Sequence, residues 1–152
     1  MPRLISVVGA ADCSAEEAQT AEEVGRLLAE KGFGVVCGGL GGAMRAACKG
    51  CKSAGGTTVG VLPGDDPAQA NEYVDTALPT GMGEARNALV AKAGEAMIAV
   101  GGEYGTLSEI AFALKQGKTV VAIGKWSGIE GVTPANSATE AVNLVVQALN
   151  AP

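Results

Sequence analysis

The chain has 152 residues, 47% of them hydrophobic and only 3% aromatic, and its formal net charge at pH 7 is −5. A chain of this length buries about two-thirds of its unfolded surface, so we expect residues 1–152 to form one domain without metal or disulfide cross-links. The acidic balance, with no basic cluster, argues against binding to nucleic acid or to an anionic membrane. The apolar runs are shorter than the roughly 20 residues that span a bilayer. We expect a cytoplasmic protein without a signal segment.

The first half of the chain alternates apolar runs with amphipathic or small-residue segments. Ser14 and Glu17 stand at capping-box spacing before an amphipathic segment, and Gly32 stands where a helix end favours positive φ. A glycine-rich loop then precedes a segment rich in alanine. The predicted elements are strands at 4–8, 35–37 and 58–62, and helices over 18–28 and 43–53.

The second half begins with a looser segment, residues 63–83, which contains a turn at 64–67 and a short strand at 73–78. Regular alternation then returns, and Ser137 and Glu140 repeat the capping-box spacing before the last helix. The predicted elements are helices at 84–93 and 106–116, strands at 97–100 and 119–123, and a final helix that ends at residue 149.

Almost wholly apolar strands that alternate with helices are typical of a parallel sheet covered on both faces. Right-handed crossovers then produce a doubly wound sheet. The sequence therefore predicts an α/β, Rossmann-like fold with a mainly parallel sheet. In this fold the loops after the strands lie along one edge, and ligands bind where the strand order reverses.

Two glycine-rich loops follow predicted strands and open predicted helices. Such loops point backbone N–H groups and the positive end of a helix dipole outward, which favours a bound phosphate. The alternative is a glycine-rich connection that binds nothing. The predicted ligand-binding residues are Gly9, Gly38, Gly39, Gly41, Gly42 and Met44 near the first loop, and Gly101, Gly102, Gly105 and Thr106 in the second.

Two charged residues are candidates for chemistry near these loops. We expect Thr106 to be the N-cap of its helix, which puts Glu109 at the capping-box position. Glu109 either caps this helix or faces the ligand, where it could hold a sugar hydroxyl or act as an acid or base. Arg86 lies in the first turn of its helix, where a cation gains nothing from the dipole. It either binds an anionic ligand or is a solvated surface arginine.

The absence of histidine excludes Ser-His and Cys-His nucleophile pairs and imidazole metal ligands. Cys48 and Cys51 form a CxxC pair that could bind metal or cycle between thiol and disulfide. This pair lies beyond the start of its helix, whereas redox pairs owe their reactivity to a helix N-terminus. We expect reduced, buried thiols and no metal site. Trp126 follows the last predicted strand and either packs or covers the ligand edge.

These segments resemble the Lonely Guy (LOG) family of cytokinin-activating phosphoribohydrolases, also labelled the possible lysine decarboxylase superfamily. The likeness spans most of the chain. The family pattern GGxxGxM is met by Gly38, Gly39, Gly42 and Met44, and the pattern PGGxGTxxE by Gly102, Gly105, Thr106 and Glu109. The catalytic arginine of the family corresponds to Arg86. The resemblance implies a homodimer or homotetramer.

Three positions depart from the family patterns. Gly101 replaces the proline, Glu103 replaces a glycine, and Asn87 replaces the lysine that usually follows the arginine. Glu103 would place a negative charge beside a bound phosphate unless its side chain turns away. The chain is also similar to a neighbouring branch that includes molybdenum cofactor carrier proteins.

The resemblance leaves two hypotheses. In the first, the protein binds a phosphorylated small molecule, a nucleotide or a pterin such as the molybdenum cofactor, and does not convert it. In the second, it hydrolyses the N-glycosidic bond of a nucleoside 5′-monophosphate. Glu109 would then stabilise the cationic sugar, and Arg86 would bind the phosphate or assist the leaving base.

Overall fold

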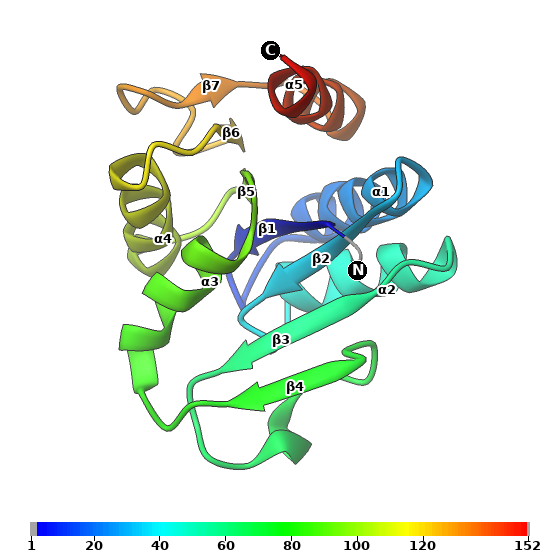
Figure 1. Ribbon diagram of the computed structural model, residues 1–152, viewed down its shortest axis with the longest axis vertical. Coiled ribbons are helices and arrows are strands. Elements are labelled where there is room, and N and C mark those ends of the chain that lie inside the picture. Colours follow the sequence, from blue (N-terminus) through cyan, green and yellow to red (C-terminus); the bar gives the residue numbers. More distant parts are fainter. Residues whose placement is uncertain (1–2, 152) are drawn as a thin grey trace.

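The computed structural model describes residues 3–151, in which seven strands form one parallel sheet (Figure 1). The strand order is β4-β3-β2-β1-β5-β6-β7. This confirms the α/β fold, and every recorded strand pair is parallel. The strands are β1 (Arg3–Gly9), β2 (Phe33–Cys37), β3 (Thr58–Leu62), β4 (Thr76–Pro79), β5 (Met97–Val100), β6 (Val120–Ile123) and β7 (Thr133–Pro134).

Helices cover both faces of the sheet (Figure 1). One face is packed against α1, α2 and α5, and the other against α3 and α4. No helix within residues 3–151 is long and apolar enough to cross a membrane. The helices are α1 (Ala15–Glu30), α2 (Ala43–Ser53), α3 (Asn87–Ala93), α4 (Tyr104–Lys115) and α5 (Ala138–Asn150), with 3₁₀ turns η1 (Pro67–Gln69) and η2 (Gly83–Arg86).

The period-two alternation of side chains divides the strand residues between the two cores. Ile5 and Val7 of β1 pack into the core beneath α1 and α2, whereas Val8 packs into the core beneath α3 and α4. Because both faces are covered, β1 is apolar along most of its length. Its buried Ser6 donates a hydrogen bond of 2.7 Å from Oγ to the carbonyl of Val90.

The helix caps were predicted well at three positions. The Ser14 hydroxyl accepts from the amide of Glu17 at 3.0 Å, and the Glu17 carboxylate accepts from the amide of Ser14 at 2.9 Å. Ser137 likewise accepts from the amide of Glu140. Gly32 follows α1 with φ of 89°.

The prediction that Thr106 is the N-cap of α4 was wrong. Gly101 and Gly102 both have positive φ and complete the turn early, and Glu103 then takes the extended conformation of an N-cap. The helix therefore begins at Tyr104, and Glu109 lies beyond the capping-box position. Other boundaries also differ, because residues 83–86 form a 3₁₀ turn before α3 and β7 follows the strand expected to be last.

Candidate functional site

A cleft of about 550 Å³ lies at the carboxyl ends of β1 and β5. The strand order reverses here, because β2 continues the sheet on one side of β1 and β5 on the other. A cleft therefore lies at the edge of the sheet where the sequence predicted ligand binding. Its lining is Gly9, Ala10, Ala11, Asp12, Leu40, Met44, Pro63, Gly83, Glu84, Arg86, Asn87, Glu103, Gly105, Thr106 and Glu109.

The helices α2 and α4, which contribute to this cleft, both begin without a side-chain cap. The other two long helices, α1 and α5, are capped by serine hydroxyls. The amides of Leu40, Gly41 and Gly42, just before α2, donate no hydrogen bond to another described residue. Uncapped N–H groups at a helix start carry partial positive charge and favour an anion.

Arg86 brings a cation to the same cleft from the end of η2. A Cβ atom at Gly38 would lie 2.9 Å from Nη2 of Arg86 and 2.8 Å from Sδ of Met44, so glycine leaves room for both side chains. The Nε atom of Arg86 is buried and has no hydrogen-bond partner within residues 3–151. A buried donor without a partner is unfavourable by about 1–3 kcal/mol, which a ligand oxygen could relieve.

Asn87 holds Arg86 in this position. Its Oδ1 accepts from Nη1 of Arg86, and its Nδ2 donates to Oγ of Ser108 at 3.0 Å. Ser108 donates in turn to the carbonyl of Gly105 at 2.6 Å. The residue that departs from the LOG pattern thus connects the arginine to the first turn of α4.

Glu109 lies within α4 on the face that lines the cleft, and only 7% of it is exposed. Burial raises the pKa of its carboxyl from 4.5 to about 8, although the charge of Arg86 acts in the opposite direction. The carboxyl makes no hydrogen bond to another described residue. Glu109 is therefore mostly protonated at neutral pH, and it can both donate and accept a hydrogen bond.

The carboxylate of Glu103 is paired with a lysine from another loop. Nζ of Lys125, which follows β6, lies 3.0 Å from Oε2 of Glu103. Both side chains are at least half exposed. The pairing reduces the like-charge repulsion that Glu103 would exert on an anion at the start of α4.

The predicted glycines divide into two groups. Gly9 and Gly105 line the cleft, whereas Gly38, Gly39, Gly41, Gly42, Gly101 and Gly102 are outside its lining. Most of the second group allow close packing, as at Gly39, where a Cβ would lie 2.7 Å from Leu62. Gly41 differs, because nothing lies within 4 Å of the place where its Cβ would be. Ligand contact by these glycines stays a prediction.

The cysteines do not pair as the CxxC spacing suggests. Sγ of Cys48 lies 3.6 Å from Sγ of Cys37, at the end of β2, and Cys51 donates to the carbonyl of Thr57. Cys37 also accepts from the amide of Gly39 at 3.3 Å. Within residues 3–151, no group of three or more Cys, Asp or Glu side chains is placed to hold a metal ion.

Two acidic lining residues, Asp12 and Glu84, were not among the predicted site residues. Asp12 lies in the loop after β1, so the rule that ligands bind at the carboxyl ends of strands could have identified it. Glu84 lies on η2, within a turn that the sequence pattern described as a regular helix. No pattern in the sequence indicated that it would reach the cleft.

Solved structures resemble this fold closely. The molybdenum cofactor binding protein of Rippkaea orientalis is 30% identical, with a TM-score of 0.93 over 99% of both chains. The molybdenum cofactor carrier protein of Chlamydomonas reinhardtii is 35% identical, with a TM-score of 0.90 over 99% of this chain and 100% of that one. DNA processing protein A of Streptococcus pneumoniae, at 20% identity and a TM-score of 0.73 over 93% of this chain and 61% of its own, shares the fold alone.

At the level of sequence, an uncharacterized protein of Archaeoglobus fulgidus is 44% identical over 142 residues, which cover 93% of each chain. Residues 2–150 match the SLOG cluster4 family. The resemblance to the LOG-like proteins and to their molybdenum cofactor carrier branch is thereby confirmed. The chain belongs to the SLOG cluster4 family.

Proposed function

We propose that the protein binds a phosphorylated pterin ligand of the molybdenum cofactor type and holds it without converting it. The observation that carries the proposal is the convergence of two uncapped helix N-termini and an unpartnered arginine Nε on one cleft. These groups are donors for an anion. The molybdenum cofactor proteins of R. orientalis and C. reinhardtii have this fold over nearly their whole length.

The cleft fits such a ligand in size and in chemistry. Its volume of about 550 Å³ falls within the usual range of small-molecule sites. The free amide of Leu40, which lines the cleft, and those of Gly41 and Gly42 beside it would hold the phosphate, since the first turn of α2 contains no acidic residue. Arg86 would add a charged donor beside them. The carboxyl groups of Glu109 and Asp12 would accept from the N–H groups of a pterin, and the bound cofactor would supply a metal group for transfer to another protein.

The protonation state of Glu109 favours binding over cleavage. N-glycosidic hydrolysis passes through an oxocarbenium-like state, which an ionised carboxylate stabilises. The pKa of Glu109, raised to about 8 by burial, leaves its carboxyl largely neutral at pH 7. A phosphate dianion in the cleft would raise this pKa further, because it disfavours a second negative charge.

A second candidate function is phosphoribohydrolase activity on a nucleoside 5′-monophosphate. The observation that favours it is that Arg86 and Glu109 both line the same cleft. A protonated Glu109 could donate its proton to the leaving base. Incubation with a panel of nucleoside 5′-monophosphates, with chromatography for free base, tests this function. Turnover that is lost in Glu109→Gln and Arg86→Ala would establish it.

The binding proposal is tested on freshly purified protein by native mass spectrometry, ultraviolet spectroscopy and measurement of molybdenum content. We expect the native protein to carry an added mass and to show pterin absorption. The ligand released by denaturation should be chemically unchanged. The melting temperature is then measured with nucleoside monophosphates and 6-hydroxymethylpterin phosphate. The proposal fails if no ligand co-purifies and none of these compounds raises the melting temperature.

A pair of glycine substitutions controls for folding. Gly41→Asp places a carboxylate before the uncapped amides of α2, and Gly128→Asp adds the same charge to the loop after β6. Neither Cβ would meet a neighbour within 4 Å. We expect Gly41→Asp to abolish the ligand-induced rise in melting temperature and Gly128→Asp to retain it. Equal loss in both variants contradicts the assignment of the phosphate to α2.

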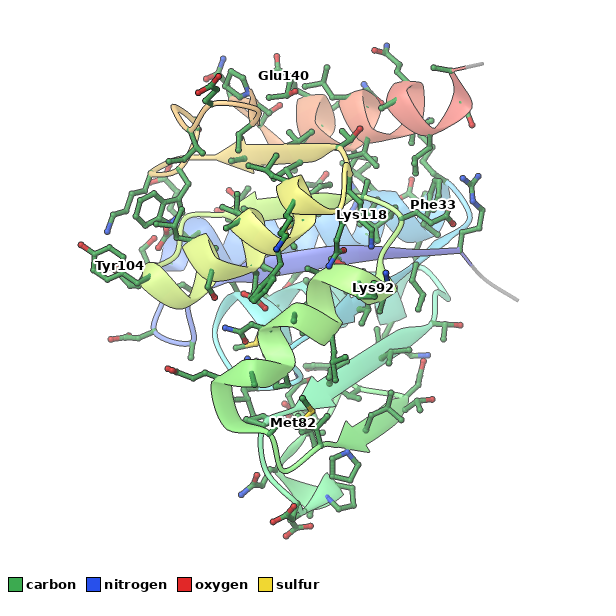
Figure 2. All side chains as sticks on the ribbon, turned by 60° about the vertical axis from the view of Figure 1, so that its left-hand side comes forward. Phe33, Met82, Lys92, Tyr104, Lys118 and Glu140 are labelled. Carbon is green, nitrogen blue, oxygen red and sulfur yellow. The ribbon has the colours of Figure 1, made fainter. Side chains whose placement is uncertain are left out.

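We also expect the protein to self-associate as a homodimer or homotetramer. Exposed apolar side chains on α3 and α4, among them Leu89 and Phe112, support this expectation, as do Leu78 and Met82 near β4. Met82, labelled in Figure 2, directly precedes η2 and α3 in the chain. Light scattering coupled to size-exclusion chromatography gives the oligomeric state, and a monomeric mass would contradict the expectation.

A further inference from the structure

Aromatic side chains are scarce in this chain, yet two of them meet at the start of α4. The chain contains two tyrosines, two phenylalanines and one tryptophan. The ring centroids of Tyr104 and Trp126 lie 6.1 Å apart, at an angle of 43°. Tyr104 is 77% exposed, the highest value among the exposed large apolar side chains. Figure 2 shows it projecting from the first turn of α4.

A lysine completes this rim, which consists of Glu103, Tyr104, Lys125 and Trp126. Nζ of Lys125 lies 4.9 Å from the ring centroid of Trp126 and 5.9 Å from that of Tyr104, and it is paired with Glu103. A cation over two aromatic rings holds the loop after β6 against the start of α4. The rim is largely exposed, since Tyr104 is 77% exposed and the side chains of Lys125 and Glu103 are at least half exposed.

The rim is continuous with the cleft. Glu103 belongs to both, and Gly105 and Thr106, which directly follow Tyr104, also line the cleft. Deeper in the cleft lies Glu109, which is buried and makes no hydrogen bond to another described residue. Tyr104, Lys125 and Trp126 are not part of the cleft lining, so the rim borders the cleft at Glu103.

The two ends of the cleft differ in charge, and this difference orients the ligand. The loop 38–42 and the first turn of α2 contain no acidic residue, whereas the α4 end carries Glu103, and Asp12 and Glu84 line the cleft from the loop after β1 and from η2. A phosphate is more stable at the end without carboxyl groups. The remainder of the ligand then extends toward α4 and its aromatic rim.

We propose that the rim is a subsite for the fused heteroaromatic ring of the ligand, a pterin or purine, which stacks on Tyr104 while its phosphate is held at α2. This inference rests on the proposed function, because the phosphate position is taken from it. Stacking of a heteroaromatic ring on an aromatic side chain contributes roughly a five- to 150-fold gain in affinity. Lys125 keeps Glu103 paired, so that the rim carries no unbalanced negative charge.

The experiment compares probes with and without a ring. Isothermal titration calorimetry measures the dissociation constants of guanosine 5′-monophosphate, 6-hydroxymethylpterin phosphate and ribose 5-phosphate. We expect at least one ring-bearing probe to bind wild-type protein about tenfold or more tightly than ribose 5-phosphate. Trp126 is the single tryptophan, so its fluorescence should fall with the ring-bearing probe and not with ribose 5-phosphate.

Three variants separate stacking from other effects. Tyr104→Ala should remove the preference for the ring and leave ribose 5-phosphate binding unchanged. Tyr104→Phe should retain the preference, because it keeps the aromatic face. Phe112→Ala removes another exposed aromatic side chain from the same helix and should also retain it.

Each outcome decides between the two proposals. If ribose 5-phosphate binds but the ring adds nothing, or if Tyr104→Ala retains the ring preference, the rim subsite is wrong and the phosphate site stands. If none of the three probes binds wild-type protein, the proposed function fails and the rim subsite fails with it. A ring preference that depends on an aromatic residue at position 104 supports the inference.

Discussion

The substitution Glu109→Gln should stabilise the protein at neutral and alkaline pH. Burial raises the pKa of the Glu109 carboxyl from 4.5 to about 8 in the folded protein. The folded state therefore retains a proton that the unfolded chain releases above pH 4.5. Stability falls as pH rises wherever the folded state binds more protons, so Glu109 destabilises the protein progressively between pH 4.5 and pH 8.

The size of the effect follows from the two pKa values. One pKa unit corresponds to about 1.4 kcal/mol, so Glu109 destabilises the fold by about 3 kcal/mol at pH 7 and by about 5 kcal/mol above pH 8. The effect is absent below pH 4.5. Glutamine has nearly the same shape and does not titrate, so Glu109→Gln should recover most of this free energy at pH 8 and almost none at pH 4.5.

Urea unfolding of wild-type and Glu109→Gln protein at pH 4.5, 6, 7 and 8 measures the difference. We expect the variant to unfold at a urea concentration higher by about 1 M or more at pH 8, and at nearly the same concentration at pH 4.5. Glu130→Gln, on an exposed loop, serves as the control for the loss of one carboxylate. A difference between Glu109→Gln and wild type that does not vary with pH would refute the reasoning, because it would place the carboxyl in a solvated environment.

Four further substitutions test local structure. Gly42→Ala should destabilise the protein by at least about 2 kcal/mol, because Gly42 has φ of 62° and its Cβ would strike the carbonyls of the loop after β1. Gly41→Ala, whose Cβ would meet nothing within 4 Å, should change the unfolding free energy by no more than about 0.5 kcal/mol. Lys118→Met should cost about 2 kcal/mol, since Nζ donates to three carbonyls at the end of α3 at 2.6–2.7 Å (Figure 2). Gly101→Pro should lower the melting temperature by several degrees, because proline cannot adopt the φ of 57° found there. Thermal unfolding monitored by circular dichroism checks all of them, and a tolerated proline or a strained Gly41→Ala would contradict the backbone geometry.

The order of strands and helices was predictable because it depends on local signals. Short, mostly apolar runs alternate with amphipathic segments, and Ser14 and Ser137 mark helix starts that the structure confirms. The start of α4 was mispredicted because the chain offered a better capping residue, Thr106, two residues after the true first residue of the helix. The consecutive positive φ values of Gly101 and Gly102 decide the matter, and no pattern in the sequence fixes them.

The position of the cleft was also predictable, but the roles of its glycines were not. A parallel sheet places the loops after its strands at one edge, so two glycine-rich loops were expected to meet there. The reason for each glycine depends on contacts distant in the sequence. Gly38 is required by Arg86, which is 48 positions away, and Gly41 faces open space. Both residues are glycines, and only their contacts in the structure show that their roles differ.

The departures from the LOG pattern are better understood as pairs than as single changes. The carboxylate of Glu17, fixed by the capping box of α1, packs against Gly101 where any Cβ would strike it. Glu103 is paired with Lys125. Gly101 and Glu103 therefore each meet a side chain from another element, α1 or the loop after β6, and restoring one motif residue alone would leave that side chain misplaced. It follows that the geometry of the altered loop depends on these contacts as well as on its own residues.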